Sequence, residues 1–214
     1  AGDPNLRISD TDGTNQRVVL AHNGGESYIV TRNNTSHGSF KLYSQNGSET
    51  LTRIRITNVG RVYIGGQNGR SPGGLTAQVQ LEGTDAGSSS MSLTRNSENA
   101  GSPSFTFNKT RGAALNANVA VKGNDTLGII QFVGNDGTDS DTPAAWILAK
   151  VDDSSSQTMG SNEMPGRLEF LTRSDTSSGS LQERLRIDSS GRTSVGRNLS
   201  SFVASNMSVA ANDF

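Results

Sequence analysis

The sequence lacks cysteine altogether. Without thiols, a disulfide scaffold and any thiolate-bound metal site are excluded. Aromatic residues make up only 5% of the 214 residues, and hydrophobic residues as a whole make up 31%. The chain reaches the lower edge of the usual apolar range only when its 25 glycines are counted. We therefore expect that one copy has too few bulky side chains to build a thick core on its own.

An excess of charge of either sign is also missing. Lys and Arg number 19 against 20 Asp and Glu, which gives a formal net charge of −1. No overall field would attract the chain to nucleic acid or to an anionic membrane. No apolar run approaches the roughly 18 residues that a membrane helix needs, and the start at Ala1 lacks the regions of a signal peptide. We expect no nucleic-acid partner and no membrane insertion, and we take the chain to be a piece of a longer protein.

What the sequence does contain is two-residue alternation of apolar and polar side chains between clusters of Gly, Ser, Asn and Asp. This pattern predicts an all-β fold. Residues 53–65 are the clearest case, because Ile54 and Ile56 fall on one face of a strand and Val62 continues that face after a short break. Gly60 stands where a left-handed backbone closes a turn at little steric cost. The segment predicts a β-hairpin.

The same hairpin pattern occurs more than once. Residues 184–196 reproduce the order of residues 53–65, with Gly191 in the place of Gly60, and a weaker copy begins at residues 6–8. The chain therefore carries an internal β-repeat. In such repeats each unit buries its apolar face only against neighbouring units or other chains.

Long polar connections separate the predicted strands. The longest are residues 82–90, 152–165 and 174–180. Such loops argue against a compact monomer and favour an elongated molecule whose short strands are covered by another copy of the chain. Because the glycines between 65 and 74 interrupt the strand pattern, we expect a hairpin segment over 1–74 and a second β-repeat region over 75–214.

Four ordered segments carry a family resemblance. They are residues 127–137, 144–152, 165–170 and 183–192. Their order and spacing resembles the repeat region of bacteriophage tail fibres and related receptor-binding fibres. With the opening at 109–112, the resemblance covers about residues 90–196. It implies an elongated, interlocked homotrimeric β-fibre that belongs to the virion and attaches it to the host. Ile129, Trp146 and Leu148 replace residues that are more often polar in this family, so we expect those strands to be covered on both faces.

The balance of forces also favours a trimer. Burial contributes about 25 cal/mol per Å² of apolar area, whereas ordering each residue costs about 1.5 kcal/mol. Three interleaved copies would bury the same strands against two partners and would pair exposed edges. The predicted trimer core contains Ile54, Ile56, Val62, Ile64, Phe105, Phe107, Ile130, Phe132, Ile147, Leu168, Phe170, Leu185, Ile187 and Val195.

Catalytic and metal-binding patterns are weak. The only histidines, His22 and His37, lie in polar surroundings, and no serine sits in a nucleophile-elbow motif. Residues 10–15 imitate the start of an EF-hand loop, but Asn15 replaces the required glycine and Ala21 replaces the bidentate glutamate. We therefore expect no catalytic, cofactor or metal site. Three loop acids could together bind Ca²⁺, but we prefer the interpretation that their side chains are solvated. These acids are Asp136, Asp139 and Asp141.

Three further groups of residues have a functional and a structural interpretation. A polysaccharide depolymerase would need paired carboxylates, for which Glu163, Glu169 and Glu183 are available, but ion pairing of Glu169 and Glu183 across strands is the simpler account. The arginines that alternate with Ile and Leu are expected to form solvent faces of strands; they are Arg53, Arg55, Arg184 and Arg186. Trp146, flanked by apolar residues, is expected to be buried rather than to stack on a sugar.

The sequence therefore predicts a non-enzymatic virion protein, a trimeric tail-fibre segment that attaches to the host surface by multivalent binding. Its partners would be two further copies, other virion proteins and a host glycan or protein. Receptor contacts are not assigned to residues. A head-surface fibre or capsid decoration protein and a tailspike depolymerase remain as alternatives.

Overall fold

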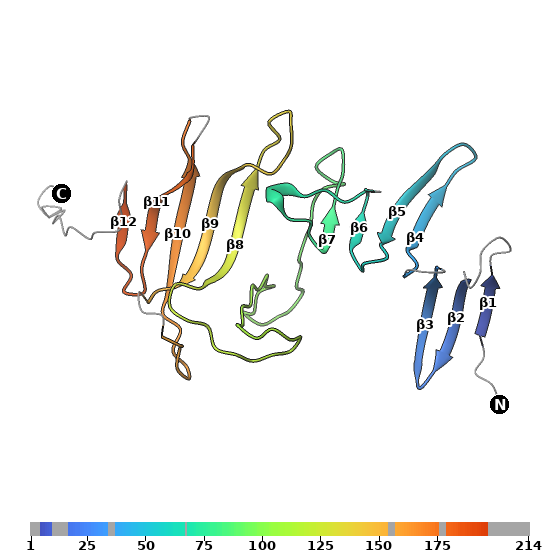
Figure 1. Cartoon of the computed structure of the whole chain (residues 1–214), viewed down its shortest axis with the longest axis horizontal. Helices are drawn as coiled ribbons and strands as arrows, with labels where there is room; N and C mark the ends of the chain where they lie inside the picture. The colour runs from blue at the N-terminus through green and yellow to red at the C-terminus, as the bar shows by residue number, and fades with distance from the viewer. Residues whose placement is uncertain are drawn as a thin grey trace, which may run out of the picture. The chain divides into compact units, whose positions relative to one another are not determined.

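The computed structural model describes most of the chain between Asn5 and Gly196. The described residues are 5–9, 17–33, 37–66, 68–153, 157–175 and 179–196. Within them the regular elements are β-strands and one three-residue 3-10 turn, so the predicted all-β class is confirmed (Figure 1). No helix in these ranges has the length and hydropathy needed to cross a membrane.

The chain divides into two compact units. Unit 1 comprises Ala1–Ser71 and Leu75–Pro103, and unit 2 comprises Pro72–Gly74 and Ser104–Phe214. The 3-10 turn η1 (Pro72–Gly74) thus belongs to unit 2, where the Gly73 N–H donates to the Ser140 carbonyl over 2.7 Å. The predicted boundary at residue 74 separates two repeat regions of the sequence and stays a prediction. The compact units instead divide the main part of the chain between Pro103 and Ser104.

Unit 1 contains two sheets. Its strands are β1 (Asn5–Ser9), β2 (Arg17–Asn23), β3 (Glu26–Arg32), β4 (Phe40–Gln45), β5 (Thr50–Ile56), β6 (Val62–Ile64) and β7 (Val79–Leu81). The first sheet has the order β1-β2-β3 and is antiparallel. The second has the order β4-β5-β6-β7, in which β7 joins β6 in the parallel direction. A parallel neighbour requires a crossover connection, which residues 65–78 provide.

Unit 2 is built on one antiparallel sheet. Its strands are β8 (Thr126–Val133), β9 (Pro143–Val151), β10 (Gly166–Arg173), β11 (Leu181–Ile187) and β12 (Thr193–Val195). They lie in the order β12-β11-β10-β9-β8, so each strand pairs with its neighbours in the sequence. Figure 1 shows β8 at one edge of this sheet and β12 at the other.

The predicted hairpins at 53–65 and 184–196 are confirmed as β5–β6 and β11–β12. In the first, the Thr57 N–H donates to the Arg61 carbonyl, and the turn glycine Gly60 has a φ of 80°. In the second, Asp188 and Arg192 make the same bond, and Gly191 has a φ of 76°. Positive φ is a conformation that glycine adopts without strain. The weaker copy also pairs, as β1 with β2, while its loop 10–16 lies outside the described residues.

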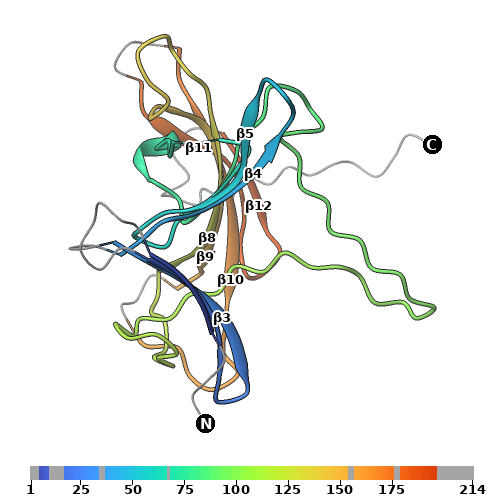
Figure 2. The same ribbon diagram turned by 90° about the vertical axis from the view of Figure 1, so that its right-hand side faces the viewer.

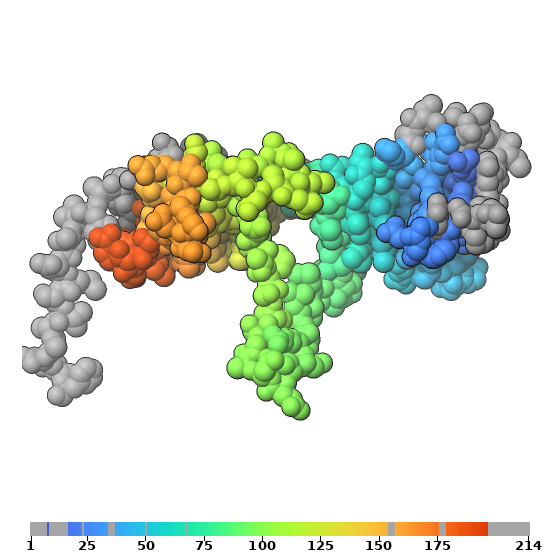
Figure 3. Space-filling model, turned by 90° about the horizontal axis from the view of Figure 1, so that it is seen from below, coloured from blue at the N-terminus to red at the C-terminus, as the bar shows by residue number. Residues whose placement is uncertain are grey.

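Two short alternating segments do not form strands. The pairs Met91 and Leu93, and Phe105 and Phe107, lie in a stretch between β7 and β8 where the described chain has no strand. Figure 2 shows this stretch, in green, as irregular chain, and Figure 3 shows its atoms in the same colour. The reason is that a strand needs a neighbouring edge to pair with, and alternation over three residues does not supply one.

Candidate assembly surface

One face of the sheet in unit 2 is apolar across all five strands. Residues directly opposite each other on neighbouring antiparallel strands point to the same side of a sheet. Ile147 of β9 lies opposite Ile130 of β8 and Phe170 of β10, and Phe170 in turn lies opposite Leu185 of β11. The resulting surface, here called the unit 2 apolar face, contains Ile130, Phe132, Ile147, Leu168, Phe170, Leu185, Ile187 and Val195.

A single chain leaves most of this face open. Val195 is 79% exposed and Phe132 is 52% exposed, and Ile130, Leu168 and Ile187 are also exposed. The remaining members, at the middle of the sheet, are half-buried. A contiguous apolar surface on a soluble protein usually marks a site of association.

The four-stranded sheet of unit 1 has a similar face. Ile54 of β5 lies opposite Leu42 of β4 and Ile64 of β6, and Ile64 lies opposite Leu81 of β7. The unit 1 apolar face contains Phe40, Leu42, Ile54, Ile56, Val62, Ile64, Val79 and Leu81. The register thus gathers the four predicted core residues of this hairpin and adds four from β4 and β7. Sequence reasoning missed those four because it predicted no strand at β4 or β7.

The predicted core residues Phe105 and Phe107 lie off the strands. Their rings pack edge to face with 4.9 Å between centroids. Phe107 lies against Gly128 of β8, where an added Cβ would come within 2.8 Å of the Phe107 Cβ and Cγ. Gly128 is opposite Ala149 in the register, on the side of the unit 2 apolar face. Phe107 therefore covers the edge of that face at β8, although both rings remain exposed.

The opposite side of the same sheet carries charged side chains. On β10, Arg167 and Glu169 alternate with apolar residues, and the Arg167 Nε donates to the Glu169 Oε1 over 2.7 Å. The Lys150 Nζ lies 2.8 Å from the Glu169 Oε2. Arg186 of β11 pairs with Glu183 at 2.6 Å and reaches the Glu169 Oε1 at 3.6 Å. Glu169 is only 3% exposed and Arg167 only 9%.

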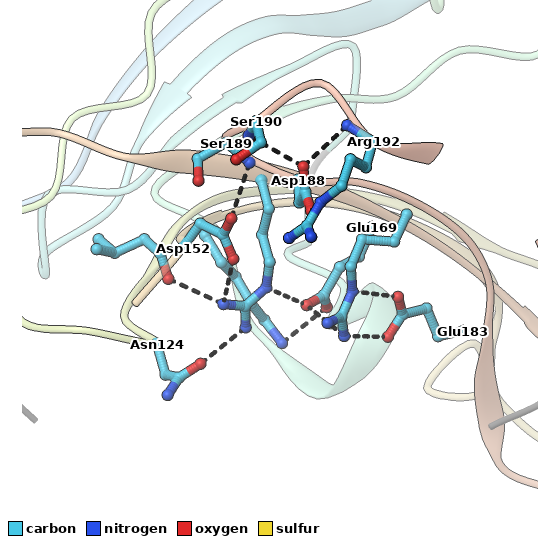
Figure 4. Close-up of polar contacts among 12 residues, drawn as sticks. Asn124, Asp152, Glu169, Glu183, Asp188, Ser189, Ser190 and Arg192 are labelled. Atoms are coloured by element: carbon cyan, nitrogen blue, oxygen red, sulfur yellow. Dashed lines mark hydrogen bonds and ion pairs between the residues drawn. The ribbon is translucent and has the colours of Figure 1, made fainter. Parts of the chain in front are cut away.

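Residues outside the sheet and at its strand ends complete the cover of these charges (Figure 4). The Arg167 Nη2 donates to the Asn124 Oδ1 over 2.9 Å, and the Arg167 Nη1 donates to the Val151 carbonyl over 3.0 Å. Asp152 lies 3.5 Å from Arg167 and accepts the Ser189 N–H over 2.8 Å. We call Lys150, Asp152, Arg167, Glu169, Glu183 and Arg186 the charged cluster. Its three cations balance its three anions, so it offers no surplus charge to an ionic ligand.

The pKa values of the buried acids follow from these contacts. Burial raises the pKa of Glu169, but hydrogen bonds from Lys150 and Arg167 outweigh it, and the pKa lies below its ordinary value. Burial also raises the pKa of Asp152, yet the Ser189 N–H and the charge of Arg167 bring it below normal. Both acids are therefore held as carboxylates, which is unlike a general acid that must keep its proton near neutral pH.

The carboxylates considered for a depolymerase are not arranged as a free pair. Glu169 pairs across strands with Lys150 and Arg186, as the ion-pair interpretation predicts, whereas Glu183 pairs with Arg186 of its own strand. The exposed Glu163 accepts the Gly160 N–H over 3.2 Å. A glycosidase needs two carboxyl groups facing each other across a substrate bond, whereas Glu169 and Glu183 are each engaged in ion pairs within the sheet.

The expectation of solvent-facing arginines is wrong for part of the set. Arg53 is exposed, and Arg184 donates to the Thr172 Oγ1, but Arg186 is buried to about three quarters within the charged cluster. The reason is that Arg186 pairs with Glu183 and turns toward the buried carboxylate of Glu169. Leu148 is buried and Trp146 is half-buried on this charged side of the sheet. We expected both faces of these strands to be covered, and the described chain covers only the charged side.

The three loop acids considered as a Ca²⁺ site make hydrogen bonds within their own loop. The Asp136 Oδ1 accepts the Thr138 N–H over 2.9 Å, and Asp139 accepts the Asp141 N–H over 3.1 Å. A hydrogen bond with Asp139 and its charge raise the pKa of Asp141. Within the described part of the chain, no three His, Asp or Glu side chains come together as a metal site would require. Residues 10–15, the EF-hand-like loop, lie outside the described residues.

No protein-family model and no curated protein matches the chain. Among solved structures, it is similar to the carboxy-terminal domain of the bacteriophage T5 L-shaped tail fibre, with a TM-score of 0.59 and 15% identity over 100% of this chain and 87% of that chain. It is also similar to the same domain solved with its intramolecular chaperone domain, with a TM-score of 0.60 and 14% identity over 92% of this chain and 55% of that chain.

These likenesses define the class of fold. The chain has a phage tail-fibre-like fold, and the resemblance predicted from the sequence is confirmed at this level. Identities this low speak for the fold, while function has to be argued from the surfaces of this chain.

Proposed function

We propose that the chain is a segment of a phage tail fibre, that it assembles as a homotrimer, and that it helps to attach the virion to the host surface. The observation that carries the proposal is the unit 2 apolar face. The chain covers the charged side of this sheet with its own residues and leaves the apolar side open. Leaving that hydrocarbon in water costs free energy, which association with identical copies would recover.

Identical copies suit this face better than an unrelated partner. The side chains across the face are aliphatic and aromatic, with no charge among them, so three such faces can meet around one axis without burying an unpaired ion. The shortage of bulky residues in the sequence supports the same conclusion. The tail-fibre-like fold supports a place in the virion tail, alongside other virion proteins.

Attachment would work by multivalency. Three copies of a weak site on one rigid body raise the effective concentration for the second and third contacts, so avidity exceeds the affinity of any single site. The irregular stretch between β7 and β8 is largely exposed and carries both polar and apolar side chains, and the described loop at 134–142 is polar. Such segments are suited to contact a host glycan or protein.

The mass of the purified protein in solution tests the trimer. We expect sedimentation equilibrium to give three times the chain mass of 22.5 kDa. A monomer at micromolar concentration would contradict the proposal. For attachment, the purified trimer should bind host cells and compete with adsorption of the phage. A trimer that neither binds nor competes would reduce the role to a spacer, and release of reducing ends from host polysaccharide would favour the depolymerase.

A further inference from the structure

Asparagine followed by glycine occurs three times in the chain, at residues 23–24, 46–47 and 68–69. In such a pair the backbone nitrogen of the glycine can attack the side-chain carbonyl carbon of the asparagine, because the glycine has no Cβ that would hinder the approach. The product is a cyclic succinimide, which water opens to aspartate or isoaspartate. The three pairs have nearly the same local chemistry, so the fold decides which of them reacts.

The pair at Asn46 lies in the loop that joins β4 to β5 (Figure 1). The Asn46 Oδ1 accepts the Glu49 N–H over 2.7 Å and the Ser48 N–H over 2.9 Å. The Asn46 N–H in turn donates to the Glu49 carbonyl over 3.0 Å. These contacts hold the asparagine side chain against the backbone that follows it. Residues 46–49 are all exposed, so water reaches the site.

The two N–H groups that hold the Asn46 side chain are also placed to assist its reaction. When the Gly47 nitrogen adds to the Asn46 Cγ, negative charge develops on the Oδ1 atom, which already accepts both hydrogen bonds. Donors fixed in advance stabilise such an oxyanion without reorganisation. An added Cβ on Gly47 would meet nothing within 4 Å. The loop therefore has room to rotate as the ring closes.

The backbones of the other two pairs are restrained. Asn23 belongs to β2 and lies opposite Glu26 of β3 in the register. Gly69 packs on the buried Tyr63, whose hydroxyl an added Cβ would overlap, and the next N–H, that of Arg70, is held by the Gln80 side chain over 2.9 Å. Closing the succinimide ring turns the backbone at the asparagine, which a strand ladder and a packed loop both resist.

We propose that Asn46 is a site of spontaneous modification in the folded protein, where its amide is converted to a carboxylate. A bond forms between the Gly47 nitrogen and the Asn46 Cγ, and the Cγ–Nδ2 bond breaks. The proton of the Gly47 nitrogen passes through solvent to Nδ2, which leaves as ammonia. Water then adds to either carbonyl group of the succinimide. This inference does not depend on the proposed function.

The modification would act on the β4–β5 hairpin. Either product places a new negative charge in the same loop as Glu49. Isoaspartate also lengthens the backbone of the loop by one methylene group, which disturbs the closure between Asn46 and Glu49. Strand β4 supplies Phe40 and Leu42 to the unit 1 apolar face, so loosening of this hairpin would reach that face.

Peptide mass spectrometry of the full chain after incubation at one mildly alkaline pH tests the site. In the native protein, we expect amide loss at Asn46 to be at least about tenfold faster than at Asn23 or Asn68, because its oxyanion donors are in place and its loop can rotate. In urea the three rates should converge to within about threefold, since the unfolded chain keeps little more than the local sequence.

The variant Gly47→Ala is the matched control for the mechanism. The methyl group has room, and Gly47 has no positive φ, so the variant should keep the fold. The added Cβ hinders the attacking nitrogen, and amide loss at Asn46 should fall at least about tenfold, while the rate at Asn68 stays unchanged.

Two results would overturn the inference. Equal native rates at Asn46 and Asn68 would mean that the β4–β5 loop gives no advantage to the reaction. A difference that persists in urea would assign the faster rate to the neighbouring residues in the sequence and not to the fold.

Discussion

Glu169 is the residue on which the charged cluster depends most. It contacts Lys150, Arg167 and Arg186, and it is almost completely buried. Removing one partner of a buried ion pair leaves the other charges without compensation, which is more costly than the pair itself is favourable. Two carboxyl oxygens thus hold three strands, β9, β10 and β11, in register on their covered side.

We predict that Glu169→Gln destabilises the protein by about 3 kcal/mol, because the amide is nearly the same size but leaves Arg167 and Lys150 with an uncompensated positive charge. Urea unfolding at one fixed protein concentration measures the loss. The control is Glu163→Gln at an exposed position, which should change stability by less than about 0.5 kcal/mol. Equal effects of the two variants would show that the cluster does not stabilise the fold.

The lowered pKa of Glu169 also predicts how stability depends on pH. Because its folded pKa lies below the ordinary 4.5, the carboxylate contributes stability that is fully present above that value. This contribution is lost as the pH falls through the lower, folded pKa. The melting temperature of the native protein should therefore decline below pH 4.5 more steeply than that of Glu169→Gln. Parallel curves would contradict this assignment.

The sequence predicts the pairing of Glu169 but not its burial. Alternation on β10 places Arg167 and Glu169 on one side, and the pairing follows from nearby arginines. The cover comes from Asn124, which bonds to Arg167 at a separation of 43 residues, and from Asp152 and Ser189. Contacts at that separation depend on how loops cross the sheet, and alternation carries no information about this.

Among the elements, the repeated hairpin has the most strictly defined backbone. Its turn uses a glycine at positive φ, and the residue that starts the turn supplies a side-chain oxygen to the backbone. The Thr57 Oγ1 accepts the Arg61 N–H over 3.0 Å, and the Asp188 Oδ1 accepts the Arg192 N–H over 2.9 Å. Threonine in one copy and aspartate in the other thus accept the same backbone hydrogen bond of the turn.

We predict that Gly191→Ala destabilises the protein by about 1 kcal/mol or more, since its φ of 76° strains an L-residue while no atom blocks the added methyl group. Gly191→Asn should cost less, because asparagine tolerates this conformation. Gly166→Ala, at an open strand position with no positive φ, is the control and should be close to neutral. Thermal unfolding compares the three variants, and a larger loss for Asn than for Ala would refute the backbone explanation.

The hairpins could be predicted because each carries its own turn signal. Glycines at fixed positions and alternation on both sides identify β5, β6, β11 and β12 without any distant contact. β7 could not be identified in this way. It has three residues, and it exists because the edge of β6 receives it. The same limit applies to the alternating pairs between β7 and β8, which find no edge within the described chain.

At the scale of the whole molecule, the main feature is that the chain covers one side of the unit 2 sheet and leaves the other side exposed. In unit 2 the chain encloses its ions and leaves its hydrocarbon outside, the reverse of the usual arrangement. The predicted core residues on strands all fall on the two apolar faces, so alternation identified them. Which copies cover these faces remains the subject of the proposed function.

We predict that Phe132→Asp weakens self-association at least tenfold, because it places a charge within a contact that is otherwise apolar. Sedimentation velocity across a range of concentrations should show the variant dissociating where the native protein stays assembled. The control, Ser180→Asp, adds the same charge at an exposed site away from the unit 2 apolar face. Equal behaviour of the two variants would exclude this face from the contact.

The reversed covering of the sheet has a kinetic consequence. If the outer hydrocarbon is shielded only after chains meet, the last step of renaturation is a collision and its rate rises with protein concentration. At high concentration, single chains with exposed apolar faces also associate in wrong orientations and precipitate. The yield of assembled protein after removal of denaturant should therefore pass through an optimum as the protein concentration is raised. The same limit would apply to newly synthesised chains in an expression host.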